Sequence, residues 1–399
     1  MGQTAREPGG PPGLPPGGIV CLSRLFVVVL MCEVAIKMRY VMMYRSQIVR
    51  MCVVASLVGW IVAAQGFAQG TAVPKPAQPK LFLELTGHYN TPDGMALLPN
   101  GDIILAVPNF NDLSVGAYMV RIAPDNSVSE FMRLPHHPVT GQPVGPLGVC
   151  VAPSGDLFLA DNQTTGERQS RVLRIVMKDG QPVDIKPVVV GTHVSNAVIC
   201  HGGYLYVSDT MIDKTVKPAI SGVLRFKLDE LDGAPVELAA DETKDPHFLG
   251  AIEVYDPVVQ LGADGLCFDK QGNLYIGNFA DGTVHRMTFD DNGNVTSNEI
   301  FARADFMKSA DGLTFDPQTG VIYVADSRQN AVQMVLPDGT VKTLAQNGDT
   351  DGRDGGMDQP CETLLRGREL IVSNMDWPVP GAINQQYDPL CTLSVIQLK

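Results

Sequence analysis

The stretch SADGLTFDPQTGVIYVAD, residues 309–326, contains two short apolar strands joined by a Gly-containing turn. Five further segments repeat this unit: TPDGMALLPNGDIILAV (91–107), GPLGVCVAPSGDLFLAD (145–161), SNAVICHGGYLYVSD (195–209), GADGLCFDKQGNLYIGN (262–278) and QPCETLLRGRELIVSN (359–374). Equivalent residues of successive copies lie 47 to 68 residues apart, which suits a four-stranded sheet with its turns. The repeats therefore predict an all-β, six-bladed β-propeller.

The two ends of the repeat region fit a closed ring. After Glu362 only 37 residues remain, which is enough for three strands. The apolar segment KLFLEL at 80–85 can supply the fourth strand, so we expect an N-terminal strand to close the last blade and residues 80–399 to form one domain. The third unit carries extra sequence at 210–222 and 237–257, interpreted as loops over one face that are either a lid or a tolerated insertion.

The N-terminal part has the pattern of targeting sequence. Residues 1–41 are interpreted as an overlong or disordered extension, because they start Pro/Gly-rich and precede further methionines. Residues 42–68 combine a basic segment, an apolar core and small residues, as a signal peptide cleaved near Ala68 does. The alternative is a retained anchor, since the apolar run approaches the ~17 residues that span a bilayer. With a linker at 69–79, the propeller is expected to be periplasmic or secreted.

Composition excludes several classes of function. The net charge is −13 and no Lys/Arg cluster occurs in the repeats, so no electrostatic surface for nucleic acid is present. Only two tryptophans occur, Trp60 and Trp377, which argues against propellers that need one in every blade. Five cysteines follow the predicted cleavage site, an odd number without a C-x-x-C motif, which indicates neither a disulfide framework nor a zinc site. A bond between Cys361 and Cys391 could still close the last blade.

One repeated position carries an oxygen-bearing side chain in five of the six units: Asp93, Asn196, Asp264, Asp311 and Glu362, with Leu147 in the second unit. The inner strands of a propeller face its axis, so these side chains are expected to converge there. Four carboxylates would raise each other's pKa, and one divalent cation would relieve that repulsion. Oxygen ligands favour Ca²⁺, with Mn²⁺, Mg²⁺ and, less suited, Zn²⁺ as alternatives.

A turn requirement is the alternative explanation of this position, because Asp-Gly is a common turn pair. Two units argue against it, since Asn196-Ala197 and Glu362-Thr363 keep the oxygen and lose the glycine. A second repeated position ends the second strand of each unit, with Val107 in the first unit and polar residues in the others: Asp161, Asp209, Asn278, Asp326 and Asn374. We interpret these mainly as strand ends that bond the backbone of a turn.

The phrases G-x-L-Y-V-A-D and D-G-L-x-F-D resemble the senescence marker protein (regucalcin), gluconolactonase and luciferin-regenerating enzyme family over residues 80–399. The resemblance implies a six-bladed propeller with an axial divalent metal that hydrolyses lactones or, in related proteins, organophosphates. It implies that Asn196 and Asp264 bind the metal and that Glu362 is the third ligand by cyclic permutation of the ring. The family's usual N-terminal E-G-P motif is absent, and its frequent extra Asn falls on Leu147, so Asp93 or Asp311 would have to compensate.

The mechanism that the resemblance implies is metal-assisted hydrolysis of a small-molecule lactone or ester. Asp264 is the first candidate for the base that deprotonates water, and Asp311 is the second. His88 and His193 precede Asp93 and Asn196, so each is a candidate for substrate binding or proton relay at the channel mouth.

Other functions have less support in the sequence. A nucleophilic serine is not indicated, because no G-x-S-x-G motif occurs. A non-catalytic, calcium-stabilised binding propeller would carry the same ring, and a lyase or strictosidine-synthase-like propeller would show less of it. The acidic stretch GDTDGRDGGMDQP (348–360) could bind Ca²⁺ peripherally but lacks the EF-hand spacing. Membrane attachment is expected only if the signal segment is retained, and the oligomeric state stays open.

Overall fold

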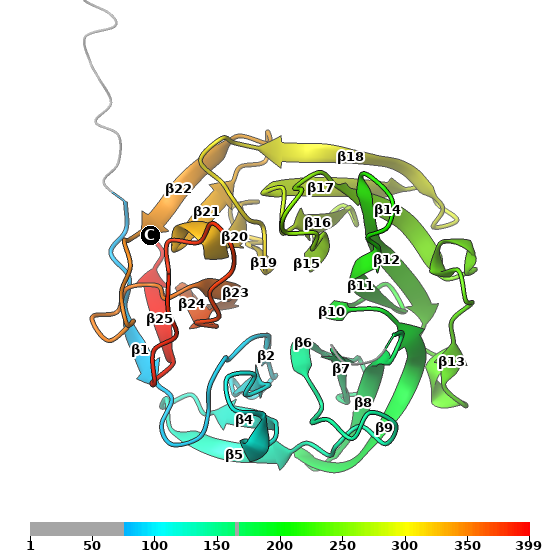
Figure 1. The fold of residues 1–399 in the computed structure, drawn as a ribbon, viewed down its shortest axis with the longest axis horizontal. Coiled ribbons are helices and arrows are strands. Elements are labelled where there is room, and N and C mark those ends of the chain that lie inside the picture. The colour runs from blue at the N-terminus through cyan, green and yellow to red at the C-terminus, as the bar shows by residue number, and fades with distance from the viewer. Residues whose placement is uncertain (1–75, 164–166) are drawn as a thin grey trace, which may run out of the picture. The chain divides into compact units, whose positions relative to one another are not determined.

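Six mainly antiparallel sheets surround a central axis in the computed structural model, which describes residues 76–163 and 167–399 (Figure 1). The six-bladed β-propeller expected from the repeats is confirmed. The predicted extension (1–41), signal peptide (42–68) and first part of the linker (69–75) lie outside the described residues. In the described part, no helix is both long and apolar enough to cross a membrane.

Each of the first three blades starts with a strand near the axis and continues outward to the rim (Figure 1). Blade 1 comprises β2 (Met95–Leu97), β3 (Ile103–Val107), β4 (Tyr118–Ile122) and β5 (Val128–Arg133). Blade 2 comprises β6 (Pro146–Val151), β7 (Leu157–Asp161), β8 (Ser170–Lys178) and β9 (Gln181–Thr192). Blade 3 comprises β10 (Ser195–His201), β11 (Tyr204–Asp213), β12 (Ala219–Lys227) and β14 (Phe248–Val254).

The other three blades repeat this arrangement. Blade 4 comprises β15 (Ala263–Phe268), β16 (Leu274–Asn278), β17 (Thr283–Phe289) and β18 (Val295–Arg303). Blade 5 comprises β19 (Leu313–Phe315), β20 (Ile322–Asp326), β21 (Ala331–Val335) and β22 (Val341–Gln346). Blade 6 comprises β23 (Pro360–Arg366), β24 (Glu369–Asn374), β25 (Thr392–Gln397) and β1 (Lys80–Glu84). Short 3₁₀ turns occur at η1 (Leu113–Val115), η2 (Glu230–Asp232), η3 (Glu242–Lys244) and η4 (Ser327–Gln329).

The last blade is built from both ends of the described chain. Strand β1 runs antiparallel to β25, with Lys80 opposite Val395 and Glu84 opposite Thr392. Because β1 hydrogen-bonds to the C-terminal strand, the first and last repeats cannot separate without breaking a sheet. The six blades therefore form one closed ring.

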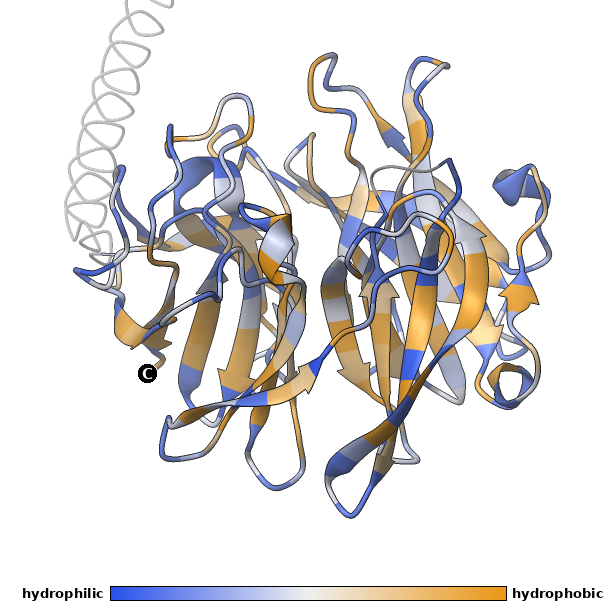
Figure 2. Ribbon diagram, turned by 60° about the horizontal axis from the view of Figure 1, so that its bottom comes forward, coloured by the Kyte–Doolittle hydropathy of each residue, from blue (hydrophilic) through white to orange (hydrophobic). Residues whose placement is uncertain are grey.

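The hydrophobic core lies between neighbouring blades. One cluster joins blades 2 and 3 and contains the buried Phe158 and Phe226, and another joins blades 6 and 1 through Ile371 and Leu105. Figure 2 shows hydrophobic residues concentrated on the strands and hydrophilic residues on the connecting loops. Burial of apolar surface stabilises a fold by roughly 25 cal/mol per Å². The blade-to-blade contacts thus hold the ring and leave the axis free for polar side chains.

Close packing of the inner strands explains why glycine follows the ring position in four blades, at Gly94, Gly148, Gly265 and Gly312. A Cβ atom on Gly148 would lie 2.6 Å from the Asn196 carbonyl oxygen, and one on Gly265 would overlap the Asp311 carbonyl oxygen. None of the four has a positive φ. The glycines are therefore required by backbone packing and not by a turn.

We expect Gly265→Ala to lower the free energy of unfolding by about 1–3 kcal/mol, because the added methyl group overpacks the interface between blades 4 and 5. Urea denaturation followed by circular dichroism measures this change. Gly233→Ala is the matched control, because its Cβ would have a single neighbour, at 3.9 Å, and its φ is −88°. Equal stability of the two variants would contradict the packing explanation.

The extra sequence of the third unit is more structured than expected. Residues 210–222 belong largely to the long hairpin of β11 and β12. Residues 237–257 contain η3 and the outer blade strand β14, so their interpretation as a loop over one face is wrong for 248–254. The short strand β13 (Val236–Glu237) adds a fifth strand to blade 2 by pairing parallel to β9.

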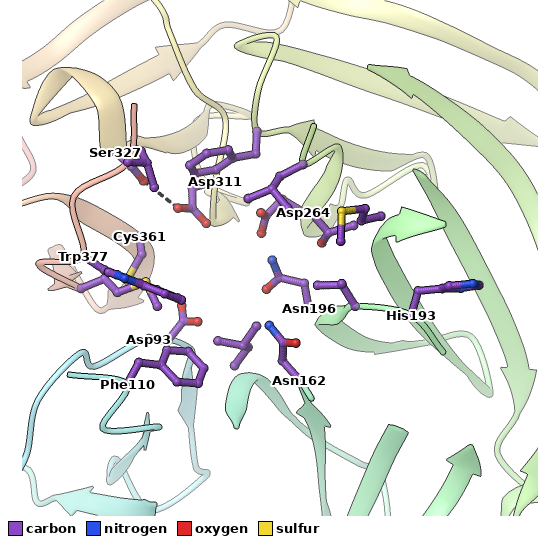
Figure 3. Close-up of a pocket in the computed structure, with 18 of the residues that line it drawn as sticks. Asp93, Phe110, Asn162, His193, Asn196, Asp264, Asp311, Ser327, Cys361 and Trp377 are labelled. Carbon is purple, nitrogen blue, oxygen red and sulfur yellow. Dashed lines mark hydrogen bonds between the residues drawn. The ribbon is translucent and has the colours of Figure 1, made fainter. Parts of the chain in front are cut away.

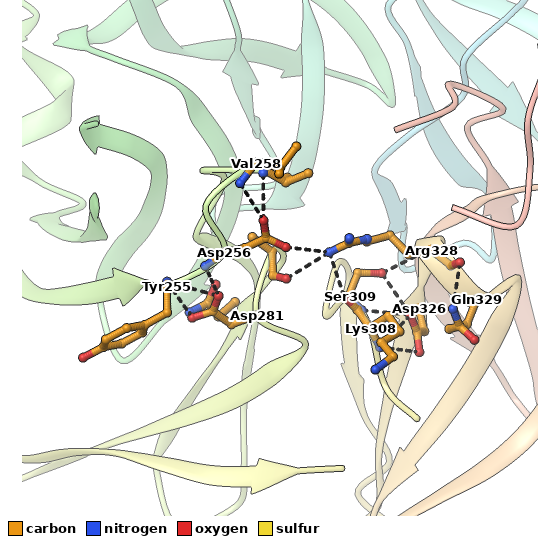
Figure 4. Close-up of polar contacts among 12 residues, drawn as sticks. Tyr255, Asp256, Val258, Asp281, Lys308, Ser309, Asp326, Arg328 and Gln329 are labelled. Atoms are coloured by element: carbon orange, nitrogen blue, oxygen red, sulfur yellow. Dashed lines mark hydrogen bonds and ion pairs between the residues drawn. The ribbon is translucent and has the colours of Figure 1, made fainter. Parts of the chain in front are cut away.

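Arg328, in η4, links the loops of neighbouring blades (Figure 4). Its Nη1 donates hydrogen bonds to Asp256 Oδ2 and to the Ala280 carbonyl oxygen, each at 3.1 Å. Asp281 in turn accepts a hydrogen bond from the backbone N–H of Asp256 at 2.9 Å. The guanidinium thus joins blade 5 to the connection between blades 3 and 4.

The five described cysteines are all free. Cys361 Sγ donates to the Pro92 carbonyl oxygen at 3.2 Å, whereas Cys391 Sγ accepts from the Thr91 N–H at 3.3 Å. The pairing of Cys361 with Cys391 considered from the sequence is therefore not formed.

Candidate active site

A cavity of about 910 Å³ opens on the propeller axis. Four of the predicted ring residues line it: Asp93, Asn196, Asp264 and Asp311. Figure 3 shows their side chains directed toward a common centre. Leu147 also lines the cavity, at the ring position where the second blade has no oxygen ligand. The structure therefore brings together the residues that the repeated sequence position predicts at the axis.

A β-bulge orients these side chains. In blade 4, Ala263 pairs with Asn278 and the register then shifts, so that Leu266 pairs with Ile276. Asp264 is one of the two residues left inside the bulge. Blades 2 and 3 show the same shift at the same place, between Pro146 and Val149 and between Ser195 and Val198. A bulge locally redirects side chains, which here turns the ring residue toward the axis.

The register of blade 6 corrects one predicted site residue. Thr363 pairs with Val372, two residues before the strand end at Asn374, just as Leu266 pairs with Ile276 two residues before Asn278. By this alignment the ring position of blade 6 is Cys361, and Glu362 occupies the position that is glycine in blade 4. Cys361 accordingly lines the cavity and Glu362 does not. A shift of one residue turns a strand's side chains to the other side.

Glu362 nevertheless lies near enough to the ring for its carboxyl to interact with the charges of the ring carboxyls. Its Oε1 accepts a hydrogen bond from the Thr363 N–H at 2.7 Å and lies against Gly312. Burial raises the pKa of Glu362 well above its usual range, and the charges of Asp93 and Asp311 raise it further. Its role as a metal ligand stays a prediction, and it would have to act from beside the ring.

The other ring carboxyls also have raised pKa values. Burial raises the pKa of Asp93 to about 7. Burial, followed by the charges of neighbouring ring residues, raises the pKa of Asp264 and of Asp311 well above the usual range. Among the described residues, no Lys, Arg or His acts on these carboxyls. The ring therefore lacks a counter-charge of its own, which is the condition that a bound cation or a set of protons would satisfy.

Asp264 and Asp311 form a pair within the ring. When one of them is protonated the two carboxyls share a hydrogen bond. The Ser327 hydroxyl lies 2.6 Å from both Asp311 Oδ2 and the Pro360 carbonyl oxygen (Figure 3). Ser327 thus holds Asp311 in place, while in the described part of the chain Asp264 has no such donor besides Asp311.

The repeat contains a further cavity-facing position that sequence reasoning missed. The residue after the end of the second strand lines the cavity in five blades: Asn162, Thr210, Phe279, Ser327 and Met375. A comparison of the repeats at the residue after the end of the second strand would have identified them. Asn162 is notable because its buried Oδ1 has no hydrogen-bond partner among the residues that the structure describes, and Figure 3 shows it beside Asn196. It brings an amide to the side of the cavity where Leu147 lacks one.

The preceding residues at the strand ends have the structural role expected of them. Asp161 Oδ1 accepts from the Gly145 N–H at 2.9 Å, and Asp326 Oδ1 accepts from the Ser309 N–H at 2.9 Å. In each case the partner is the loop just before the inner strand of the same blade. These carboxylates therefore fix the loop that leads into the ring position.

The two predicted histidines lie in different surroundings. His193 lines the cavity, and its Nδ1 is 3.0 Å from Oε2 of Glu242, a buried residue of η3. The hydrogen bond to Glu242 raises the pKa of His193, and Figure 3 shows its ring directed away from the axis. His88 is exposed and packs on Tyr89 and Tyr118, outside the cavity lining. The expectation that His88 stands at the channel mouth is therefore wrong.

An apolar wall covers much of the cavity. The rings of Phe110, from blade 1, and Trp377, from the β24–β25 connection, lie 4.9 Å apart between centroids. Met211, Phe279 and Met375 add further apolar surface. The cavity therefore combines the polar ring with an extensive apolar surface and some polar side chains on its walls, an arrangement typical of sites for small organic molecules.

The ligand atoms of the axial ring lie farther apart than those of a preformed three-ligand metal site. Among the described residues, two groups bring three His, Cys or carboxylate ligand atoms within 4.8 Å of one another: His193, Asp209 and Glu242, and Asp358, Asp376 and Asp388. The axial ring is not one of them. Its donor set still fits a hard divalent cation, because it consists of uncompensated oxygens and includes the unpartnered Asn162 Oδ1 nearby.

Comparisons with known proteins identify the fold. No protein-family model matches the sequence, and comparison with curated proteins gives no match. Among solved structures, a luciferin-regenerating enzyme superposes with a TM-score of 0.56 at 13% identity, covering 80% of this chain and 95% of its own. A protein assigned as a gluconolactonase superposes with a TM-score of 0.51 at 17% identity, covering 82% of this chain and 95% of its own.

A third neighbour has different chemistry. The PQQ-bound aldose sugar dehydrogenase of Streptomyces coelicolor superposes with a TM-score of 0.52 at 14% identity, covering 81% of this chain and 99% of its own. The neighbours thus include the family that the repeated phrases resemble. At these identities the likeness shows the fold alone, and the function has to be argued from the site.

Proposed function

We propose that this protein is a metal-dependent hydrolase of lactones or related esters. The observation that carries the proposal is the ring of buried carboxyls without a counter-charge at the floor of a cavity with apolar walls. Enzymes of acyl transfer need a site that stabilises a developing oxyanion and a base that activates water. The ring offers a carboxyl as the base, and a cation held by the ring would stabilise the oxyanion.

The proposed cofactor is one divalent cation, held by Asp93, Asn196 and Asp264. Asp311 and Glu362 would complete the negative surroundings, and Asn162 offers a free amide oxygen. Ca²⁺ is the first choice because all donors are oxygens, with Mn²⁺, Mg²⁺ and Zn²⁺ as alternatives. When bound, such a cation supplies Lewis-acid polarisation of the substrate carbonyl.

The chain's own residues supply the proton transfer. Asp264 accepts the proton of the attacking water, because its partner Asp311 is the carboxyl that Ser327 already bonds. Asp311 then holds the shared proton and passes it toward the leaving alkoxide. His193 lies at the cavity wall with Nδ1 occupied by Glu242, so it contributes to substrate binding through its remaining ring edge.

The walls indicate the class of lactone. Phe110, Met211 and Trp377 offer a large apolar contact surface, and polar side chains such as Gln163, Arg168 and Thr215 also line the cavity. A site lined in this way favours a substrate with an alkyl or aryl substituent. We therefore infer that a substituted lactone is a better substrate than gluconolactone.

The test is hydrolysis by the purified protein after chelation, with and without added Ca²⁺, Mn²⁺ or Mg²⁺. We expect activity to fall at least about 100-fold on chelation and to return with a metal. We also expect kcat/KM for δ-decalactone to exceed that for δ-gluconolactone by about tenfold or more, because each buried methylene contributes roughly 0.8 kcal/mol. Bovine serum albumin with the same metals controls for uncatalysed hydrolysis.

Two results would contradict the proposal in different ways. Hydrolysis that persists after chelation would remove the metal from the mechanism. Metal binding that raises the melting temperature without any turnover would favour the second candidate, a calcium-stabilised binding propeller. That candidate rests on the same uncompensated ring, which a structural ion would satisfy equally well.

The proposed compartment is the periplasm or the outside of the cell. This proposal rests on the signal-peptide pattern of residues 42–68. The proposed partner is a small-molecule substrate, and membrane attachment follows only if that segment is retained.

A further inference from the structure

A second cluster of carboxylates lies away from the cavity lining, in blade 6. Asp358, Asp376 and Asp388 bring three ligand oxygens within 4.8 Å of one another. Asp358 and Asp376 are fully buried, and Asp388 is half-buried. We call these three residues the outer acidic site.

One oxygen of this site is left without a partner. Asn384 donates through Nδ2 to Asp358 Oδ1 and, at 3.2 Å, to Asp376 Oδ1. The Asp388 N–H donates to Asp376 Oδ2 at 2.6 Å. Among the described residues, the buried Asp358 Oδ2 accepts no hydrogen bond. A fully buried carboxylate oxygen that belongs to a cluster of three carboxylates and receives no donor is a vacant ligand atom.

The surroundings make the site more negative. Burial raises the pKa of both Asp358 and Asp388, and the charges of Asp349 and Asp351, in the acidic stretch 348–360, raise both further. Burial raises the pKa of Asp358 to about 7, and burial with the charge of Asp358 raises the pKa of Asp376 to about 8. The charge of Arg353 acts on Asp388 in the opposite direction and lowers its pKa.

We propose that the outer acidic site binds a divalent cation, with Ca²⁺ preferred, and that this ion fixes the loop that walls the cavity. The three carboxylates offer oxygen atoms as ligands, and oxygen is the ligand atom that Ca²⁺ prefers. Their irregular arrangement suits Ca²⁺ better than Mg²⁺, which demands near-octahedral geometry. This site is separate from the axial ring and does not depend on the proposed hydrolase activity.

The loop connects the ion to the cavity through adjacent residues. Asp376 directly precedes Trp377, whose ring packs on Phe110 of blade 1. The Asp376 carbonyl oxygen also accepts a hydrogen bond from Asn111 Nδ2 at 3.4 Å. Without a cation, repulsion among the three carboxylates acts on the segment that positions Trp377. With a cation, both the loop and its aromatic ring are held against blade 1.

Trp377 provides the readout. In the full chain carrying Trp60→Phe it is the single tryptophan, so its fluorescence reports this loop. We expect titration with Ca²⁺ to change the emission in a saturable way, and Mg²⁺ to do so only at about tenfold or higher concentration. Asp358→Asn and Asp388→Asn should each weaken Ca²⁺ binding by about tenfold or more. Asp354→Asn is the matched control, because Asp354 lies in the same loop and Asn preserves its turn hydrogen bond to the Gly356 N–H.

Two measurements separate the outer acidic site from the axial ring and from misfolding. The Ca²⁺ response should survive in an Asp264→Ala background, whereas loss there would assign the ion to the ring and overturn the proposal. In chelator, Asp358→Asn should melt at or above the wild-type temperature, because it removes repulsion, and it should lose the stabilisation by Ca²⁺. An Asp358→Asn/Asp388→Asn variant that binds Ca²⁺ with wild-type affinity and stoichiometry would also overturn the proposal.

Discussion

Asp264→Asn should lower kcat for lactone hydrolysis by about 10³-fold, which combines the usual contribution of a general base with the loss of a charged ligand. Asn keeps the size of the side chain but cannot accept a proton from water. The carboxyl is 5% exposed and its ionisation is opposed by its neighbours, so its removal should not destabilise the fold. Steady-state kinetics at saturating metal, together with the melting temperature in chelator, measure the two effects.

The controls for this variant separate base from ligand. Asp338→Asn is the matched substitution, because Asp338 sits in an exposed turn where Asn can still accept from the Thr340 N–H. If Asp264→Asn recovers activity at high metal concentration, Asp264 is a ligand and Asp311 becomes the base. If Asp264→Asn keeps more than a tenth of the wild-type kcat without added metal, Asp264 is neither the base nor an essential ligand.

Raising the pH should destabilise the metal-free protein between about pH 5 and pH 8. The pKa of Asp93 is about 7 in the folded state and 3.8 as its ordinary value, so the folded state binds the proton more tightly. The stability that this carboxyl contributes is fully present below its unfolded pKa and is lost as the pH rises through 7. Each such carboxyl lowers the free energy of unfolding by up to about 1.4 kcal/mol per pH unit.

A bound cation should remove this dependence, because it replaces the protons as the counter-charge. Thermal unfolding at pH 5, 6, 7 and 8 in chelator and in Ca²⁺ tests the expectation. Asp93→Asn should flatten the chelator curve in part, and Asp358→Asn should do so independently, since its carboxyl also has a pKa of about 7. A curve in chelator that is flat or rises with pH would show that the buried carboxyls do not hold protons.

Much of the architecture could be predicted from repetition alone. A copy of the same strand–turn–strand unit must occupy the same place in each blade, so Asp93, Asn196, Asp264 and Asp311 can be placed at the axis from the sequence. A turn requirement is the alternative explanation of the glycine after three of them, whereas the structure shows that the neighbouring backbone requires it. That contact joins strands of different blades, and no local pattern reports it.

The misplacement of Glu362 has a physical origin. Blade 6 was aligned by its carboxylate, which put Glu362 at the ring, but the strand register puts Cys361 there. A bulge adds one residue to one strand, so the side chain that faces the axis depends on pairing with the partner strand. Ser327 and Asn162 each follow a strand-ending aspartate, and their residue types vary between blades, so the repeated pattern does not mark them.

Repetition in the sequence predicts the six blades and three carboxylates with one amide on the axis, because these features recur at a fixed spacing, and the apolar segment before the first repeat predicts the closing strand. Tertiary packing sets which loops wall the cavity, brings His193 to Glu242 while His88 stays outside, and gathers Asp358, Asp376 and Asp388 in blade 6. These are contacts between segments that do not repeat. Their positions depend on how distant parts of the chain pack, and sequence periodicity carries no information about that packing.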